Sequence, residues 1–211
     1  MNTRRPYFVA VAGNIGAGKS SLTRLLSDRF KWKPVFESVE DNPYLPDFYK
    51  DMKRWSFHLQ MYFLANRFVH HRSIVASGES VVQDRTIYED AEIFARNLHE
   101  MGNMDGRDYS TYVSLFQVMM GFLKPPDLLI YLRASVETLL RQIERRGRSF
   151  EQQIPREYLE RLHTHYERWI HSYDRGPLLI LDSDTIDFVN RPDDADRIVT
   201  EILQALEHHY Q

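Results

Sequence analysis

Residues 13–20, with the sequence Gly-Asn-Ile-Gly-Ala-Gly-Lys-Ser, constrain the fold of this chain more than any other segment. They match the phosphate-binding pattern G-x-x-x-x-G-K-[ST] at every position. A short apolar run, Tyr7–Ala12, comes before them, and apolar residues at helical spacing follow in Ser21–Phe30. Strand, glycine-rich loop and helix together let backbone N–H groups and a helix N-terminus surround a polyphosphate. The segment therefore predicts a site for a nucleoside triphosphate.

The residue types in this loop each have a physical role. Glycines are needed because the loop adopts unusual backbone angles and no Cβ can stand between the backbone and a phosphate. Lys19 is expected to reach the β- and γ-phosphates, and the hydroxyl of Ser20 to ligate Mg²⁺. The residues expected to bind the nucleotide are Gly13, Asn14, Ile15, Gly16, Ala17, Gly18, Lys19, Ser20 and Ser21.

Bulk composition narrows the class of protein. A chain of 211 residues with 43% hydrophobic and 27% charged residues suits one α/β domain with a substantial core. The formal net charge of −3 gives no global basic field for binding a nucleic-acid polymer. Cysteine is absent, which excludes disulfides, thiol catalysis and cysteine-bound zinc, and favours the reducing cytoplasm. Apolar runs are too short for a membrane span, so we expect no membrane partner.

Strands and helices are expected to alternate along the whole chain. Five short apolar segments, each followed by a helical pattern, predict a five-stranded parallel sheet with helices on both faces, in a single α/β domain over residues 1–211. The architecture expected is a three-layer sandwich. The predicted strands cover residues 7–12, 34–37, 80–85, 127–132 and 178–182, and the predicted helices about 53–77, 89–100, 109–122, 136–145, 155–173 and 193–210. The prolines of residues 41–46 predict a loop there.

Acidic residues follow several of the predicted strands. Glu37, Asp84 (followed by Arg85) and Asp182 all lie where a parallel sheet places its ligands, at the carboxyl ends of strands. Two aspartates therefore compete to support Mg²⁺. By pattern, Asp182 after four apolar residues is more typical of such an acid than Asp84, and the residues alone leave both open.

Three arginines surround one glycine near the middle of the chain. Arg145, Arg146 and Arg148 could close over phosphates as an arginine-rich lid at about residues 145–154. The alternative is a solvated basic helix end, which the helix dipole would favour.

Several short motifs, taken in order, resemble the deoxynucleoside kinases, and most of all the small bacterial deoxyadenosine/deoxyguanosine/deoxycytidine kinases. The motifs are Glu37, Asp41–Leu45, Tyr49–Gln60, Asp84–Tyr88 and Arg146–Arg148, and the similarity extends from Phe8 to about Trp169 and returns at Asp182–Phe188. The resemblance implies a P-loop kinase-like fold and an enzyme that transfers the γ-phosphate of ATP to the 5′-hydroxyl of a deoxynucleoside.

The resemblance also implies roles on the phosphate side of the site. Glu37 would be the general base for the 5′-hydroxyl, and Arg85 would hold that base and the hydroxyl in line. With Lys19 they form the expected catalytic set. Asp84, rather than Asp182, would then take the role linked to Mg²⁺. The lid arginines Arg146 and Arg148, with Asp187 and Phe188 near the adenine, would complete the ATP site.

On the acceptor side, the resemblance implies contacts to the sugar and the base. Tyr49 and Glu151 would hold the 3′-hydroxyl. Gln60, Arg67 and Asp90 would read the edge of the base, and Phe94 would stack on its face. Phe63 departs from the pattern: it lies on the helix face of Gln60 and Arg67, where some relatives have a small residue, so it bears on the width of the substrate pocket.

Helical spacing supports part of this set. Gln60 and Arg67 are two turns apart and share one helix face. A buried arginine is tolerable only beside a counter-charge, and an Arg67–Asp90 pair would supply it. Such a pair disfavours thymine, which has no amino group to donate to a carboxylate. The alternative for each of these residues is plain packing or a surface ion pair.

Two other functions compete with this interpretation. A nucleoside monophosphate kinase of the thymidylate kinase type shares the loop and a basic lid, but it needs extra arginines for an acceptor phosphate and no carboxylate base, so Glu37 argues against it. A nucleotide-dependent switch would not need a lid, and the guanine-reading N-K-x-D motif is missing. The resemblance further implies a purine preference, with deoxycytidine possible, and a homodimer, for which the helices at 53–77 and 109–122 carry surplus apolar faces.

Overall fold

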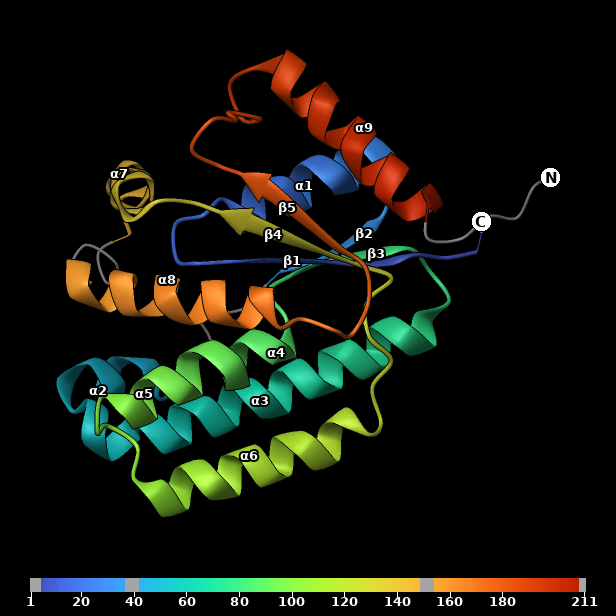
Figure 1. Ribbon diagram of the computed structural model, residues 1–211. Helices are drawn as coiled ribbons and strands as arrows, with labels where there is room; N and C mark the ends of the chain where they lie inside the picture. The colour runs from blue at the N-terminus through green and yellow to red at the C-terminus, as the bar shows by residue number, and fades with distance from the viewer. Residues whose placement is uncertain (1–4, 37–41, 149–153, 209–211) are drawn as a thin grey trace. The chain divides into compact units, whose positions relative to one another are not determined.

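The computed structural model describes residues 5–36, 42–148 and 154–208 (Figure 1). These residues form two compact units. The sheet unit draws its described residues from the segments 1–36, 78–85 and 125–211, and the helical unit draws its own from the segments 37–77 and 86–124. Each unit is described by itself below. The expectation of a single domain with a lid at about 145–154 stays a prediction.

The sheet unit contains five parallel strands in the order β2-β3-β1-β4-β5, as the sequence predicts. The strands are β1 (Phe8–Gly13), β2 (Lys33–Val35), β3 (Val81–Asp84), β4 (Leu128–Arg133) and β5 (Leu178–Asp182). Every residue of the central strand β1 is buried, which explains why its sequence is a continuous apolar run. Because all the strands are parallel, Gly13, Asp84 and Asp182, the last residues of β1, β3 and β5, lie at the carboxyl ends of the strands on the same side of the sheet.

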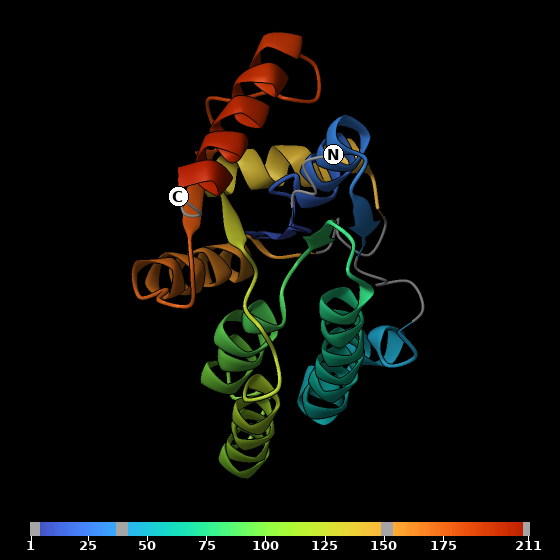
Figure 2. The same ribbon diagram turned by 90° about the vertical axis from the view of Figure 1, so that its right-hand side faces the viewer.

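Helices cover both faces of this sheet. On one face lie α1 (Lys19–Phe30) and α9 (Pro192–His208), and on the other lies α8 (Arg156–His171), while α7 (Val136–Arg146) follows β4 (Figures 1 and 2). The main core lies between the sheet and the helices α1 and α9. Its side chains include Val11, Leu26, Ile130, Ile198 and Ile202. The prediction of helices on both faces of a parallel sheet is thus confirmed.

The helical unit is built around one long helix. This helix, α3 (Met52–Ser77), packs against α2 (Leu45–Lys50), α6 (Gly106–Met120) and a helical run from Ile87 to Glu100. That run is made of α4 (Ile87–Glu89), the π-helix η1 (Asp90–Ala95) and α5 (Arg96–Glu100). Sequence periodicity predicts an ordinary helix over residues 89–100, so the π-helical middle is a departure from that expectation.

Helix boundaries differ from the predicted ones where local chemistry decides them. The prolines predict a loop over residues 41–46, yet α2 begins inside this segment at Leu45, because Pro46 is tolerated in the first turn of a helix. Helix α6 begins at Gly106, earlier than predicted, because the carboxylate of Asp105 accepts hydrogen bonds from the backbone N–H groups of Arg107 and Asp108.

Among the described residues, no helix combines the length and the apolar character that crossing a membrane requires.

Candidate functional site

The phosphate-binding loop connects β1 to α1, and its glycines are structurally required. Gly16 and Gly18 have φ angles of 87° and 96°, in the left-handed region that residues with a Cβ rarely adopt. A Cβ on Gly16 would lie 2.8 Å from the backbone oxygen of Leu139. The side chain of Lys19 turns back over the loop, where Nζ donates to the carbonyl oxygens of Gly13 (2.8 Å) and Asn14 (2.9 Å). The predicted loop is therefore formed in full.

A cavity of about 680 Å³ opens beside this loop, within the sheet unit. Its lining includes residues 16–21 of the loop and its helix, the basic side of α7, and residues 183–189 and 191, which follow β5. Five arginines are among its described lining residues, namely Arg141, Arg145, Arg146, Arg148 and Arg191. Its volume lies in the range of small-molecule sites. Guanidinium groups and backbone N–H groups facing one cavity are suited to a polyphosphate.

The predicted nucleotide residues outside the loop also line this cavity. Arg146, Arg148, Asp187 and Phe188 are all part of it, and a Cβ on Gly18 would lie 3.5 Å from Cζ of Phe188. The carboxylate of Asp187 accepts hydrogen bonds from the side-chain amide of Asn190. These bonds lower the pKa of Asp187 and outweigh burial, which acts to raise it. Asp187 is therefore a charged group that its own loop holds in place.

A second acid, Asp184, anchors the same segment to α7. Its carboxylate accepts hydrogen bonds from the N–H and the hydroxyl of Ser135, the residue that caps α7. Burial acts to raise the pKa of Asp184, but hydrogen bonds from Thr138 and Ser135 outweigh it and the pKa is lowered. The segment after β5 is thus tied to α7, the helix that carries Arg141, Arg145 and Arg146.

The two aspartates that competed for the Mg²⁺ role lie in different environments. Asp84 is buried, and its Oδ2 accepts a 2.5 Å hydrogen bond from the hydroxyl of Ser20. Its Oδ1 is also buried and has no hydrogen-bond partner within the described ranges. Asp182 is exposed and accepts from the backbone N–H of Asp184. Only Asp84 therefore combines a neighbouring loop hydroxyl with a free buried oxygen.

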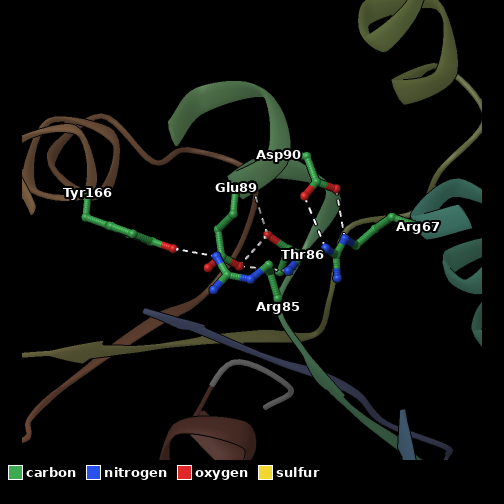
Figure 3. A network of polar contacts seen from close by, with 6 residues as sticks. All are labelled: Arg67, Arg85, Thr86, Glu89, Asp90 and Tyr166. Carbon is green, nitrogen blue, oxygen red and sulfur yellow. Dashed lines mark hydrogen bonds and ion pairs between the residues drawn. The ribbon is translucent and has the colours of Figure 1, made fainter. Parts of the chain in front are cut away.

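Arg85 follows Asp84 in an unusual conformation. It is buried and has a φ of 70°, one of two non-glycine residues with positive φ in the described part of the chain. Such a conformation persists only where the surroundings fix it. Here the backbone N–H of Arg85 donates to Val11 O (2.9 Å), and its Nη1 donates to the hydroxyl of Tyr166 (2.9 Å; Figure 3). The side chain of Arg85 therefore has a defined direction.

The next residue begins the run of helix in the helical unit. Thr86 caps α4, and a reciprocal capping box joins it to Glu89: the Thr86 N–H and hydroxyl donate to Glu89 Oε2, and the Glu89 N–H donates to Thr86 Oγ1 (Figure 3). Glu89 is fully buried. The motif Asp84–Tyr88 thus spans a strand end and a firmly capped helix start.

Arg67 and Asp90 form the buried ion pair that the sequence predicts. Arg67 on α3 donates from Nε to Asp90 Oδ2 (2.8 Å) and from Nη2 to Oδ1 (3.1 Å), and the two side chains are only 6% and 3% exposed (Figure 3). The two parallel hydrogen bonds fix both side chains in one plane. Asp90 is the first residue of η1, and π-helical turns occur frequently at functional sites.

Two further polar groups of the helical unit are buried. Oε1 of Gln60 on α3 and the hydroxyl of Tyr112 on α6 have no hydrogen-bond partner among the residues that the structure describes. Burial, with the negative charge of Asp90 adding to it, raises the pKa of Tyr112 well above its ordinary value. A buried amide oxygen without a partner is costly unless a ligand donates to it, so Gln60 fits a site for a polar ligand.

The remaining predicted residues divide between the described part of the chain and the rest. Phe63 and Phe94 are half-buried in the helical unit, and Tyr49 is exposed at the end of α2. Glu37 and Glu151, the predicted base and one of the predicted sugar ligands, lie outside the described residues.

Sequence reasoning missed other residues of this region. Tyr166 carries no sequence signal, because an aromatic residue on the apolar face of a helix is typical of a core position. The Thr86–Glu89 capping box could have been found, since the pattern T-x-x-E before a helix is its signature. Arg141 and Arg191 lie outside the glycine-centred arginine run, and only folding brings them to the cavity.

Comparison with known proteins supports one family. A family model described as "Deoxynucleoside kinase" matches residues 9–207 of this chain. Among curated proteins, a deoxyadenosine/deoxycytidine kinase of Bacillus subtilis (strain 168) is 45% identical over 200 residues, covering 94% of this chain and 92% of that protein. A deoxyguanosine kinase of Lactobacillus acidophilus is 39% identical over 207 residues, covering 94% of this chain and 90% of that protein.

Solved structures give the same result. A deoxyadenosine kinase from M. mycoides with bound dATP is 32% identical, with a TM-score of 0.79 over 92% of this chain and 98% of that one. The same enzyme with the products dCMP and a flexible dCDP has a TM-score of 0.82 at 31% identity, over 93% of this chain and 98% of that one.

Proposed function

Because this chain belongs to the deoxynucleoside kinase family, we propose specific roles for its residues in the transfer of the γ-phosphate of ATP to the 5′-hydroxyl of a deoxynucleoside. The observation that carries these roles is the completed phosphate-binding loop beside a cavity lined by five arginines. Phosphoryl transfer depends mainly on positioning and on neutralising charge, and both can be assigned to named groups.

ATP is proposed to bind in the cavity of the sheet unit. The N–H groups of the loop and Lys19 would hold the β- and γ-phosphates, and Arg146 and Arg148 would close over them as the lid of a single domain. In the structure Lys19 already donates to two loop carbonyls, so it needs only to exchange these partners for phosphate oxygens. Asp187 and Phe188 are proposed to bind the adenine.

Mg²⁺ is the expected cofactor, and the residues fit it. Ser20 supplies a hydroxyl oxygen, and Asp84 supplies a carboxylate whose Oδ1 is buried without a partner in the described part of the chain. Oxygen donors of this kind, few in number, are what Mg²⁺ uses when it also binds a nucleotide phosphate. When bound, the ion would neutralise charge on the phosphates. Asp84 would hold it through carboxylate oxygen, and Ser20 through its hydroxyl.

The acceptor is proposed to be read by the helical unit. Arg67 donates and Asp90 accepts, while Gln60 can do both, which suits a base that carries an amino group beside a ring nitrogen. Adenine, guanine and cytosine meet this requirement and thymine does not. The names of the relatives cover deoxyadenosine, deoxyguanosine and deoxycytidine, and we expect purines to be favoured. Phe94 would stack on the base, Phe63 would limit the pocket, and Tyr49 and Glu151 would hold the 3′-hydroxyl.

The phosphoryl transfer itself needs a general base and a 5′-hydroxyl aligned with the γ-phosphate. Glu37 is proposed to take the proton of the 5′-hydroxyl, and Arg85 to hold that hydroxyl in line with the γ-phosphate. Replacing Glu37 by Gln should abolish turnover and leave ATP binding in place. Near-normal turnover in Glu37→Gln would contradict the assignment of the base.

A coupled assay of ADP release tests the function as a whole. ATP and Mg²⁺ are supplied with deoxyadenosine, deoxyguanosine, deoxycytidine, thymidine or dTMP, each alone. We expect ADP only when a nucleoside is added, with the fastest turnover for the purines and the slowest for thymidine. Activity confined to dTMP would instead support a monophosphate kinase.

A homodimer, located in the cytoplasm, completes the proposal. Large apolar side chains are exposed on or beside two helices of the helical unit, namely Val69 on α3, Val118 on α6 and Phe122 just after α6. Contiguous exposed apolar surface marks interaction sites, and α3 and α6 pack against each other. Light scattering should give about twice the chain mass of 25.1 kDa, and Val118→Asp with Phe122→Asp should give the monomer. A wild-type mass of one chain would contradict the dimer.

A further inference from the structure

Tyr166 on α8 connects two parts of the candidate active site through a single hydroxyl group. Its side chain is fully buried, and the hydroxyl lies 2.9 Å from Arg85 Nη1 and 2.9 Å from the carbonyl oxygen of Gly13 (the Arg85 bond in Figure 3). Gly13 is the first residue of the phosphate-binding loop, and Arg85 directly follows Asp84, the last residue of β3. Three segments far apart in the sequence therefore meet at one oxygen atom.

The direction of both hydrogen bonds follows from the chemistry of the groups. A guanidinium can only donate and a carbonyl oxygen can only accept. The Tyr166 hydroxyl must therefore accept from Arg85 and donate its one proton to Gly13. A replacement for Tyr166 would need a hydroxyl at the same position to make both contacts. Phenylalanine has no hydroxyl and makes neither.

The ring of Tyr166 is held independently of its hydroxyl. It stacks on Tyr131 of β4, with ring centroids 5.7 Å apart and an interplanar angle of 15°. Removing the oxygen should therefore leave the ring where it is. Tyr131 is equally buried, but its own hydroxyl donates to Glu167 (3.0 Å) rather than to a residue of the site. The two tyrosines thus form a matched pair, in which one hydroxyl bonds Arg85 and Gly13 and the other bonds Glu167.

Arg85 has particular need of such a partner. Its φ of 70° is unfavourable for a residue with a side chain, so the contacts around Arg85 must hold this backbone conformation. We propose that Tyr166 is a positioning residue that fixes the Arg85 guanidinium relative to the phosphate-binding loop. The inference rests on the function proposed above for Arg85, and it adds a residue that would act only through Arg85 and Gly13.

Kinetics of the full-length Tyr166→Phe variant test the inference, with Tyr131→Phe as the control. Loss of a hydrogen bond to a charged group should lower kcat about 10- to 100-fold in Tyr166→Phe. The KM for ATP should change less than about threefold, because the phosphates bind loop N–H groups and not the Gly13 carbonyl. Tyr131→Phe should keep kcat within about twofold of the wild type, even if it loses as much thermal stability as Tyr166→Phe does. Equal kcat values for the two variants would overturn the proposal.

A double-mutant cycle with Arg85→Lys tests whether Tyr166 affects kcat through Arg85. The lysine keeps the charge and loses the planar fork. If Tyr166 acts through Arg85, adding Tyr166→Phe to Arg85→Lys should lower kcat by less than about threefold further. Two losses that multiply would overturn the proposal.

Arg85→Lys alone separates this inference from the function on which it rests. A wild-type kcat in that variant would contradict the role proposed for Arg85. A large loss there, with full activity in Tyr166→Phe, would contradict only the inference about Tyr166.

Discussion

The hydroxyl of Ser20 donates a 2.5 Å hydrogen bond to Asp84, although 64 positions separate the two residues in the sequence. Parallel pairing of β1 with β3, in which Val11 is opposite Asp84, brings them together at the edge of the sheet. Asp182 also lies at the carboxyl end of its strand, β5, but it is exposed and accepts a hydrogen bond from its own turn. The two aspartates differ because of the strand order, in which β3 lies beside β1 and β5 is an outermost strand, separated from β1 by β4.

This arrangement predicts that Asp84 controls the response to Mg²⁺. Asp84→Asn keeps the size of the side chain and removes its charge, so we expect the apparent affinity for Mg²⁺ to fall about 10- to 100-fold. ADP release measured over a Mg²⁺ titration gives this quantity. Asp182→Asn is the control and should follow the wild-type curve. The reverse pattern, with loss in Asp182→Asn alone, would return the role to Asp182.

The Arg67–Asp90 pair predicts a linked loss of stability and base selection. Asp90→Asn leaves the buried guanidinium without its counter-charge, which should cost about 3–5 kcal/mol of unfolding free energy. It also removes the acceptor for an amino group, so the kcat/KM ratio of deoxyadenosine to thymidine should fall by about tenfold or more. Urea unfolding and the ADP-release assay measure the two effects.

Glu92→Gln is the matched control for that variant. Glu92 pairs with Arg96 one turn along the same helical run, and both side chains are 35% exposed. A pair of this kind contributes only about 0.3–0.5 kcal/mol. The control should therefore keep both stability and base selection. An unchanged base ratio in Asp90→Asn would show that Asp90 has a structural role only.

The sequence predicts the parts of this molecule that depend on local pattern. Continuous apolar runs indicate the buried parallel strands, and the glycine pattern of residues 13–20 indicates the loop, because both follow from short stretches of residues. The Arg67–Asp90 pair is a longer-range success, obtained from the resemblance together with the rule that a buried arginine needs a counter-charge.

Other features depend on contacts between distant segments. The π-helical turn of η1 has nearly the side-chain pattern of an α-helix, so periodicity does not reveal it. The left-handed backbone of Arg85 is not typical of its residue type, and its contacts to Val11 and Tyr166 come from distant segments. Tyr166 itself is indistinguishable in sequence from the apolar residues that surround it on α8. Strand order and helix packing decide these features.

Gly16 predicts a local defect in ATP binding. In Gly16→Ala the new methyl group would meet Leu139 O at 2.8 Å, and the residue would keep an unfavourable φ of 87°. The loop must shift, so we expect the affinity for ATP to fall at least about tenfold, measured by calorimetry.

Gly78→Ala separates backbone strain from the geometry of the loop. Gly78 also has a positive φ, of 66°, but nothing lies within 4 Å of a Cβ placed there. This control should lose about 1 kcal/mol of stability and bind ATP normally. A Gly16→Ala variant that also binds ATP normally would show that the loop adapts to a side chain.

His71 predicts a dependence of stability on pH. It is buried on α3, and its Nε2 lies 2.7 Å from the carbonyl oxygen of Lys124, to which it donates. Burial lowers its pKa below the usual 6.5, and the bond to Lys124 only partly opposes this. Below pH 6.5 the unfolded chain therefore takes up a proton at this position that the folded chain resists. The contribution of neutral His71 to the free energy of unfolding should be complete above pH 6.5. It should be lost as the pH falls toward the lower pKa of the folded state.

Urea unfolding at pH 7.5, 6.5 and 5.5 measures this loss. The wild type should lose at most about 1.4 kcal/mol per pH unit more than His71→Gln, which can donate a hydrogen bond but cannot take up a proton in this range. His70→Gln changes the exposed neighbouring histidine on the same helix and should follow the wild-type curve. If His71→Gln and the wild type lose stability in parallel below pH 6.5, proton uptake by His71 does not contribute to the pH dependence, and the loss arises from other groups.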